Sequence, residues 1–300
     1  MPSLLSRLAG SPPDMTGGAL TLILAAAFAH ASWNFLNKHA GGHATFTWLV
    51  ALLSALLYAP ATITIVHVWE IKINFVMLGV ITGSAALHTA YFVLLNQAYR
   101  IGDLSLVYPL ARGTGPLLAS LAAIAFLGER PSLLALGGAL AIIGGAMVLT
   151  TNLAQLRGSE ARDPLLYAWV TGLFIAAYTL WDKQAVSRFA VAPLVLDWGA
   201  NIGRAVFLTP FALRYSDQAV AEWREHKYEA LGCAVLIPLA YILVLTALRF
   251  TPVSYVAPAR EISILIGTVM GARFLGEGDA RRRLAGACAM VLGVVGLAVG

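Results

Sequence analysis

Polar and aromatic side chains recur at helical spacing inside apolar segments of this sequence. His30, Trp33 and Asn34 lie three and four residues apart, which places them on one face of a helix. His88 and Tyr91 share the three-residue spacing in a later segment. Polar groups in an apolar segment are costly unless they face protein or water. These faces are therefore expected to point toward a polar or ligand-filled interior.

The side chains that we expect to line one chamber are mostly aromatic, with two arginines among them. They are His30, Trp33, Asn34, His88, Tyr91, Tyr108, Arg112, Tyr178, Trp181, Tyr241, Tyr255 and Arg260. Aromatic rings accept flat or bulky apolar groups and attract an ammonium through cation–π contact, whereas an arginine can hold a carboxylate with two hydrogen bonds. Together these properties describe a zwitterionic amino acid with a large side chain.

Arg112 is our choice for the partner of the carboxylate. It lies about nine residues into its apolar segment and so near the middle of a membrane. Arg260 is its counterpart in the second half of the chain, but the adjacent Glu261 is expected to neutralise it. The alternative for each arginine is a structural ion pair inside a helix bundle.

Other polar residues raise the question of ion coupling. Asp197, Asn201 and Arg204 lie four and three residues apart, so they share one helix face. Glu261 is the candidate proton carrier, because a carboxyl group in a low dielectric is pushed toward its neutral form, although the neighbouring arginine opposes this. A histidine in a helix is more often a hydrogen-bonded packing residue. Proton antiport and movement of substrate down its own gradient both stay open.

The sequence repeats itself, and the repeat carries a pair of prolines. Ser105 and Pro109 recur as Ser254 and Pro258. A proline cannot donate to the carbonyl four residues earlier, so both halves are expected to carry a kink and a free serine carbonyl. Hydrocarbon cannot satisfy that carbonyl, which must face protein, water or substrate. The functional interpretation is a pair of bent, gating helices beside a cavity; the alternative is a kink that only improves packing.

The amino-acid composition indicates which kind of secondary structure and surroundings hold these residues. Only 12% of the residues are charged and 59% are hydrophobic, which is far too apolar for a soluble chain of this length. The net charge of +5 is scattered between hydrophobic runs, so it does not indicate nucleic-acid binding. The chain is therefore expected to be an all-α integral membrane protein.

We expect ten transmembrane helices, arranged as two inverted five-helix repeats around a central cavity. The expected helices are residues 18–38, 45–67, 74–98, 103–127, 132–152, 164–187, 191–214, 229–250, 252–275 and 282–300. The segment between the seventh and eighth helices is expected to hold a short interfacial helix. Since five is an odd number, the second repeat must insert upside down relative to the first.

The repeats divide the chain into four parts. These are an N-terminal tail at 1–17, a first repeat at 18–152, a connecting loop at 153–163 and a second repeat at 164–300. The first apolar run is interpreted as a retained helix and not a cleaved signal peptide, because it has a counterpart that opens the second repeat. The last apolar run, 284–300, covers about 25 Å of a ~30 Å bilayer core, so the natural chain is expected to continue beyond it.

Two further motifs recur between the halves. Leu-Gly-Glu ends at Glu129 and again at Glu277. These carboxylates close oppositely inserted helices and should lie on opposite membrane surfaces, so a structural capping or hairpin role is expected and not a catalytic pair. Small residues at four-residue intervals indicate a seam of close helix packing, either within the bundle or against a second subunit. They are Gly137, Ala141 and Gly145 in the first repeat, and Ala285, Ala289 and Gly293 in the second.

The Ser-x-x-x-Pro and Leu-Gly-Glu motifs in each of two five-helix halves resemble the drug/metabolite transporter superfamily, specifically its ten-helix EamA-type family. The resemblance implies a multi-pass transporter of the cell inner (plasma) membrane that exports amino acids. Within the family, the chain is most similar to the aromatic amino-acid exporters. The alternative is a proton-coupled multidrug or small-metabolite efflux pump.

We expect no enzymatic activity, no cofactor and no metal, because the sequence offers no nucleophile, metal-ligand set or pair of carboxylates at one depth of the membrane. The expected partners are a small-molecule substrate, namely an amino acid, and the lipid bilayer. Basic residues are more numerous in the loops on the side opposite the N-terminus, which favours both ends outside the cytosol. Family members are generally drawn with both ends cytoplasmic. We follow the resemblance and leave the orientation and the oligomeric state open.

Overall fold

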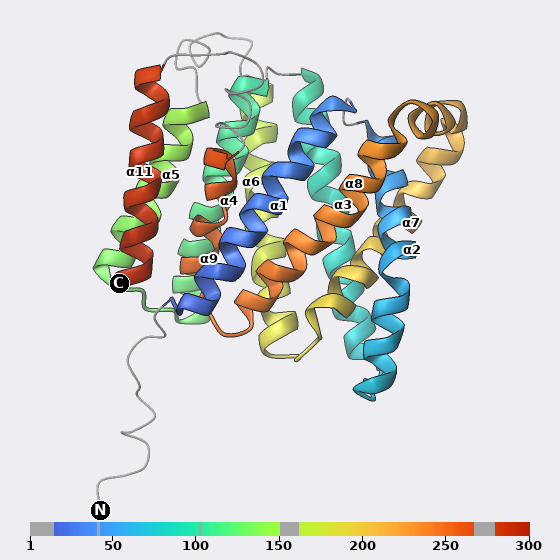
Figure 1. The fold of residues 1–300 in the computed structure, drawn as a ribbon, viewed down its shortest axis with the longest axis horizontal. Coiled ribbons are helices and arrows are strands. Elements are labelled where there is room, and N and C mark those ends of the chain that lie inside the picture. The colour runs from blue at the N-terminus through green and yellow to red at the C-terminus, as the bar shows by residue number, and fades with distance from the viewer. Residues whose placement is uncertain (1–14, 41–42, 102–103, 151–161, 267–279) are drawn as a thin grey trace, which may run out of the picture.

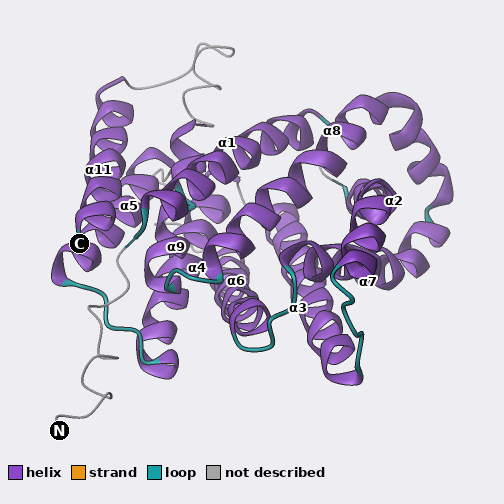
Figure 2. Ribbon diagram, turned by 60° about the horizontal axis from the view of Figure 1, so that its bottom comes forward, coloured by secondary structure: helices purple, strands orange, loops and turns teal. Residues whose placement is uncertain are grey.

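The computed structural model describes residues 15–40, 43–101, 104–150, 162–266 and 280–300. All regular secondary structure in these ranges is helical (Figure 2), as the sequence predicts. The first repeat consists of α1 (Gly17–His39), α2 (Ala44–Val68), α3 (Phe75–Ile101), α4 (Leu104–Leu127) and α5 (Leu133–Thr150). The second consists of α6 (Arg162–Ser187), α7 (Pro193–Arg214), α8 (Ser216–Leu248), α9 (Val253–Ala259) and α11 (Ala280–Val299).

Most of these helices begin and end within three residues of their predicted bounds, because long apolar runs leave little choice of secondary structure. Five of the helices in the described ranges are long and apolar enough to cross a membrane, and three further apolar helices are shorter. Large apolar side chains lie on the outside, with Phe75 92% exposed and Phe126 84% exposed. Such an outer surface suits lipid as the solvent.

Helix α8 begins earlier than predicted. It starts at Ser216, and the backbone is non-helical at His226, with φ −125° and ψ 30°. The short helix that was predicted before the eighth span is therefore present, and it joins the span across this kink. Pro238 lies further along α8 without ending the helix.

The ninth helix is interrupted, contrary to the prediction of one helix over 252–275. Helix α9 ends at Ala259, and the chain is helical again from 262. At the interruption the amide of Glu261 donates to the carbonyl of Pro258 at 3.0 Å, a bond one residue shorter than in an α-helix. By contrast, α4 is helical throughout, including Pro109. Within the described residues, the helix is thus interrupted after Pro258 in the second repeat, whereas the helix that carries Pro109 continues; the kink expected at Pro109 stays a prediction.

The repeats are inverted, and α5 and α11 show this most directly. A Cβ atom added to Gly138 would lie 2.5 Å from the carbonyl oxygen of Gly293, and one added to Gly145 would lie 2.7 Å from that of Gly286. Later residues of α5 thus meet earlier residues of α11, so the helices are antiparallel neighbours (Figure 1). The small-residue seam packs within the bundle. It does not include Gly137, which has open space around it.

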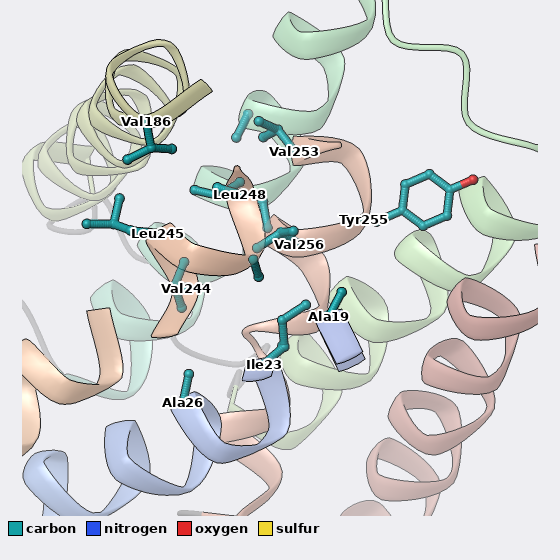
Figure 3. Packing of buried hydrophobic residues seen from close by; sticks show 14 of the residues in the cluster. Ala19, Ile23, Ala26, Val186, Val244, Leu245, Leu248, Val253, Tyr255 and Val256 are labelled. Atoms are coloured by element: carbon teal, nitrogen blue, oxygen red, sulfur yellow. The ribbon is translucent and has the colours of Figure 1, made fainter. Parts of the chain in front are cut away.

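The other helices also pack across the two repeats. Helix α1 packs on α8, and the equivalent pair, α6 and α3, packs in the same way. The largest buried cluster extends over helices of both repeats, and where α1, α8 and α9 meet it includes Ile23, Leu245, Leu248 and Val256 (Figure 3). This apolar core joins the two repeats.

Candidate functional site

A cavity of about 70 Å³ lies between the two repeats. Its walls come from α1, α3, α4, α6, α7 and α8, and from the residue that follows α9. The lining combines aromatic rings, small apolar residues and four charged side chains: Ala26, Ala27, His30, Trp33, His88, Tyr91, Phe92, Arg112, Tyr178, Asp197, Arg204, Ile237, Ala240, Tyr241, Val244 and Arg260. Mostly apolar walls with a few convergent polar groups are typical of small-molecule sites.

Arg112 is engaged by neighbouring side chains. Its guanidinium contacts the Nε2 atom of His30, and the Nδ1 atom of the same ring accepts a hydrogen bond from Trp33 at 3.1 Å. On its other side, Arg112 forms an ion pair with Glu261, with 3.8 Å between Nη1 and Oε1. Both partners are buried. The structural alternative, an ion pair inside the bundle, therefore holds for Arg112.

Arg260 is the repeat counterpart of Arg112, but its neighbours are tyrosines and not a carboxylate. Its guanidinium donates to the hydroxyl of Tyr178 at 3.5 Å and lies 6.0 Å from the ring centroid of Tyr241. Within the described ranges, no carboxylate lies within ion-pair distance of Arg260. Among the residues that the structure describes, the direct ion pair of Glu261 is formed with Arg112 and not with the adjacent Arg260.

The aromatic wall is organised around a buried acid. Asp182 Oδ2 lies 3.0 Å from His88 Nε2 and accepts a hydrogen bond from the hydroxyl of Tyr241 at 2.5 Å. The His88 ring stacks on Tyr178 with 4.1 Å between centroids, and Tyr91 packs edge-on against Tyr178 at 5.6 Å. These contacts fix the rings that face the cavity.

Helix α7 supplies a second polar set, which the sequence pattern showed but did not assign to the site. Asn201 donates to the Asp197 carboxylate at 3.0 Å and accepts from Arg204 at 3.2 Å. The guanidinium of Arg204 lies 4.7 Å above the ring of Phe92. Asp197, Arg204 and Phe92 all line the cavity. The four- and three-residue spacing of the polar residues on α7 was the sequence signal from which these residues could have been assigned to the cavity.

Three residues that were expected in the chamber lie elsewhere. Trp181 is 42% exposed, donates to the carbonyl of Val80 at 2.9 Å and lies on the outer side of α6. Tyr255 is buried, and its hydroxyl donates to the carbonyl of Gly300 at 3.4 Å. Asn34 donates to the carbonyl of His30 in its own helix at 2.7 Å. For these residues the prediction is wrong, because helical spacing defines a face without saying what that face meets.

The remaining predicted residues differ in what the structure shows. Tyr108, Ser105 and Pro109 belong to α4, but their side chains lie outside the described residues. Ser254 and Pro258 are buried within α9 and do not line the cavity.

Two charged residues, Glu129 from the loop between α4 and α5 and Lys183 from α6, hold the turn that leads into α9. The carboxylate of Glu129 accepts hydrogen bonds from the amides of Val253 and Ser254, at 2.7 and 2.9 Å. Lys183 donates to the carbonyls of Leu248 and Thr251, at 2.6 and 3.0 Å. The capping role predicted for Glu129 is thus confirmed. This pair of caps positions α9, which ends one residue before Arg260.

Comparison with known proteins agrees with this architecture. The EamA-like transporter family matches residues 17–151 and 164–299, one match for each repeat. The chain belongs to the EamA-like transporter family. This EamA-like transporter is therefore a membrane transporter built from two inverted repeats.

Solved structures support the fold of this EamA-like transporter. One is described only as a crystal structure of a protein, with a TM-score of 0.76 and 14% sequence identity, and the similarity covers 94% of this chain and 96% of that one. At this identity the likeness concerns the fold alone. A search of curated proteins found no match.

Proposed function

We propose that this EamA-like transporter exports large neutral amino acids, aromatic ones in particular, across the cell inner membrane by alternating access. The observation that carries the proposal is the placement of Arg260. This cation lines the cavity, has no carboxylate within ion-pair distance in the described part of the chain and lies beside tyrosine rings.

The cavity offers a partner for each part of such a substrate. Arg260 suits the carboxylate, because a guanidinium can donate two parallel hydrogen bonds to it. Asp197 and the ring faces of Tyr91 and Tyr178 suit the ammonium. The same rings and Phe92 accept an aromatic side chain through stacked or edge-on contacts.

The size of the cavity supports a transport mechanism in which the two repeats move relative to each other. A volume of about 70 Å³ has room for a few water molecules and is too small for an amino acid with an aromatic ring. The proposed substrate therefore requires the two repeats to separate on one side or the other. An interrupted ninth helix next to Arg260 provides a place where such movement costs few backbone hydrogen bonds.

The second candidate is a proton-coupled efflux pump for drugs or other small metabolites. It is favoured by Glu261, which is buried and whose Oε2 atom has no hydrogen-bond partner. Two observations favour the amino-acid exporter over it. Glu261 is paired with Arg112 and does not line the cavity, and three arginines in the lining would repel lipophilic cations.

Counterflow in liposomes tests the proposal. The purified protein is reconstituted with unlabelled phenylalanine, tyrosine, tryptophan or leucine inside, and uptake of the labelled amino acid is measured. Uptake of the aromatic amino acids, competed by each other and not by lipophilic cations, supports the proposal. Transport of lipophilic cations in a proton gradient, with no amino-acid exchange, would assign the second function instead.

A further inference from the structure

We propose that the transporter carries a binding site for an anionic phospholipid, in a groove formed by the turns that follow α2, α6 and α8. This groove has a volume of about 380 Å³, several times that of the central cavity, and it is lined by none of the residues that line that cavity. The inference is independent of the proposed substrate. It concerns the surface at one end of the helix bundle.

The groove lies where membrane-spanning helices end. The turns after α2, α6 and α8 lie at the same end of the bundle (Figure 1), and residues of all three turns line the groove. Trp69 and Phe189 form part of its wall and are 61% and 47% exposed. Exposed aromatic residues at the ends of apolar helices are typical of the depth at which lipid headgroups lie. The groove therefore lies at the depth of the lipid headgroups, and a headgroup is the ligand available to it there.

The polar part of the groove is cationic. Lys72 lies in the turn after α2, and Arg249 lies directly after α8, so one cation comes from each repeat. Both are exposed, and neither has an ion-pair partner within the described ranges. Arg188 adds a third cation nearby, with its guanidinium 5.9 Å from the ring centroid of Phe189. The one acidic residue in these turns, Glu70, does not line the groove.

A hydrogen-bond donor completes this polar part. Asn74 lines the groove, and its side-chain oxygen accepts the amide of Met77 at 2.8 Å. That bond leaves the side-chain nitrogen of Asn74 as the donor. Two cations and an amide donor together suit a phosphate, which takes charge-assisted hydrogen bonds on several oxygens.

The rest of the groove is apolar, which distinguishes a lipid from a free anion. Ile71, Val76 and Met77 line it on the side of α3, and Val191 lines it on the side of α7. Val76 is 58% exposed and adjoins Phe75, which is 92% exposed on the lipid-facing surface. An occupant with a phosphate between the cations can therefore lay an acyl chain along α3. A soluble phosphate would leave these apolar walls in contact with water, which is unfavourable.

Native mass spectrometry of the full-length protein in detergent tests this inference. The protein is titrated with phosphatidylglycerol, with phosphatidylcholine of the same acyl chains, or with inorganic phosphate. We expect retained phosphatidylglycerol adducts at concentrations where phosphatidylcholine gives few. The Lys72→Gln/Arg249→Gln double variant should lose at least about tenfold in lipid affinity, since each charge-assisted contact is worth about a factor of ten or more.

The matched control is Arg130→Gln, which removes an exposed cation from another turn at the same end of the bundle. It should bind phosphatidylglycerol like the wild type. A second measurement tests the site even if the double variant folds poorly. Brominated phosphatidylglycerol quenches the fluorescence of nearby tryptophans, and this quenching should be weaker in Trp69→Phe than in the wild type. Equal binding of the two lipids, no effect of the double variant, or displacement of the lipid by millimolar phosphate would overturn the assignment.

Discussion

Arg112 in α4 and Glu261, which follows α9, form a buried ion pair that links the two repeats, with 3.8 Å between their nearest charged atoms. The repeat counterpart of Arg112 is Arg260, and Glu261 is the residue that follows Arg260 in the sequence. As a result the two equivalent arginines, which both line the cavity, differ in their partners: Arg112 is held by a carboxylate, whereas Arg260 has none within ion-pair distance in the described part of the chain. In the proposed function, Arg260 is therefore the arginine left to bind the carboxylate of the substrate.

Replacing Arg260 should weaken substrate binding more than it weakens the fold. In Arg260→Gln the charge-assisted bonds to a carboxylate are lost, which we expect to raise the KM of amino-acid counterflow about 10- to 100-fold. Arg260→Lys should lose less, since it keeps the charge without the two-pronged geometry. Thermal unfolding in detergent serves as the control and should change little. An unchanged KM in both variants would remove Arg260 from the site.

The ion pair should behave as a structural element. Glu261→Gln leaves the buried guanidinium of Arg112 without its carboxylate, and breaking a buried pair costs about 3–5 kcal/mol. The double variant Arg112→Met/Glu261→Met should recover much of this free energy of unfolding, because no buried charge is left unpaired. The measurement is a double-mutant cycle of unfolding in detergent. Additive effects would show that the two residues are not coupled.

Two tyrosines that looked equivalent in the sequence should respond differently to loss of the hydroxyl. Tyr241→Phe removes the 2.5 Å hydrogen bond to Asp182 beside the cavity, so we expect counterflow to fall several-fold. Tyr255→Phe removes only a 3.4 Å contact to the carbonyl of Gly300, away from the cavity. It should transport at the wild-type rate. Equal losses in the two variants would contradict the cavity as described.

The helix seam gives a matched pair of glycine substitutions. An alanine at position 138 would place its Cβ 2.5 Å from the backbone oxygen of Gly293, so α5 and α11 would have to separate. Overpacking of this kind costs about 1–3 kcal/mol, and the Tm of Gly138→Ala should fall accordingly. Gly137→Ala adds a methyl group in open space and should be neutral or slightly stabilising. Equal Tm values would mean that the helices pack in another register.

The caps on the α8–α9 turn should affect transport through Arg260. Glu129→Ala leaves two amides of α9 without acceptors, a loss comparable to that of a helix cap, about 1–2 kcal/mol. Since α9 leads directly to Arg260, we expect a raised KM as well as a lower Tm. Addition of substrate should raise the Tm of wild type more than that of Glu129→Ala. A lower Tm with an unchanged KM would limit Glu129 to a structural role.

Much of the architecture is determined by the sequence alone. Long apolar runs can satisfy their backbone groups in lipid only as helices, so the number and approximate bounds of the spans follow from hydropathy. Inversion follows from an odd number of spans per repeat, and α5 and α11 show it directly. The family, too, could be inferred from Ser-x-x-x-Pro and Leu-Gly-Glu recurring at the same places in both halves.

The tertiary structure alone decided which polar residues meet. Helical spacing places His30 and Trp33 on one face, but it cannot tell that Trp181 points outward or that Tyr255 packs near Gly300. It also could not show that Glu261 forms its ion pair with Arg112 and not with the adjacent Arg260. Periodicity defines a face relative to the axis of its own helix, whereas contacts depend on how helices rotate and pack against one another. That rotation is set by the close approach of small residues and by caps that join distant turns, so only the folded bundle determines it.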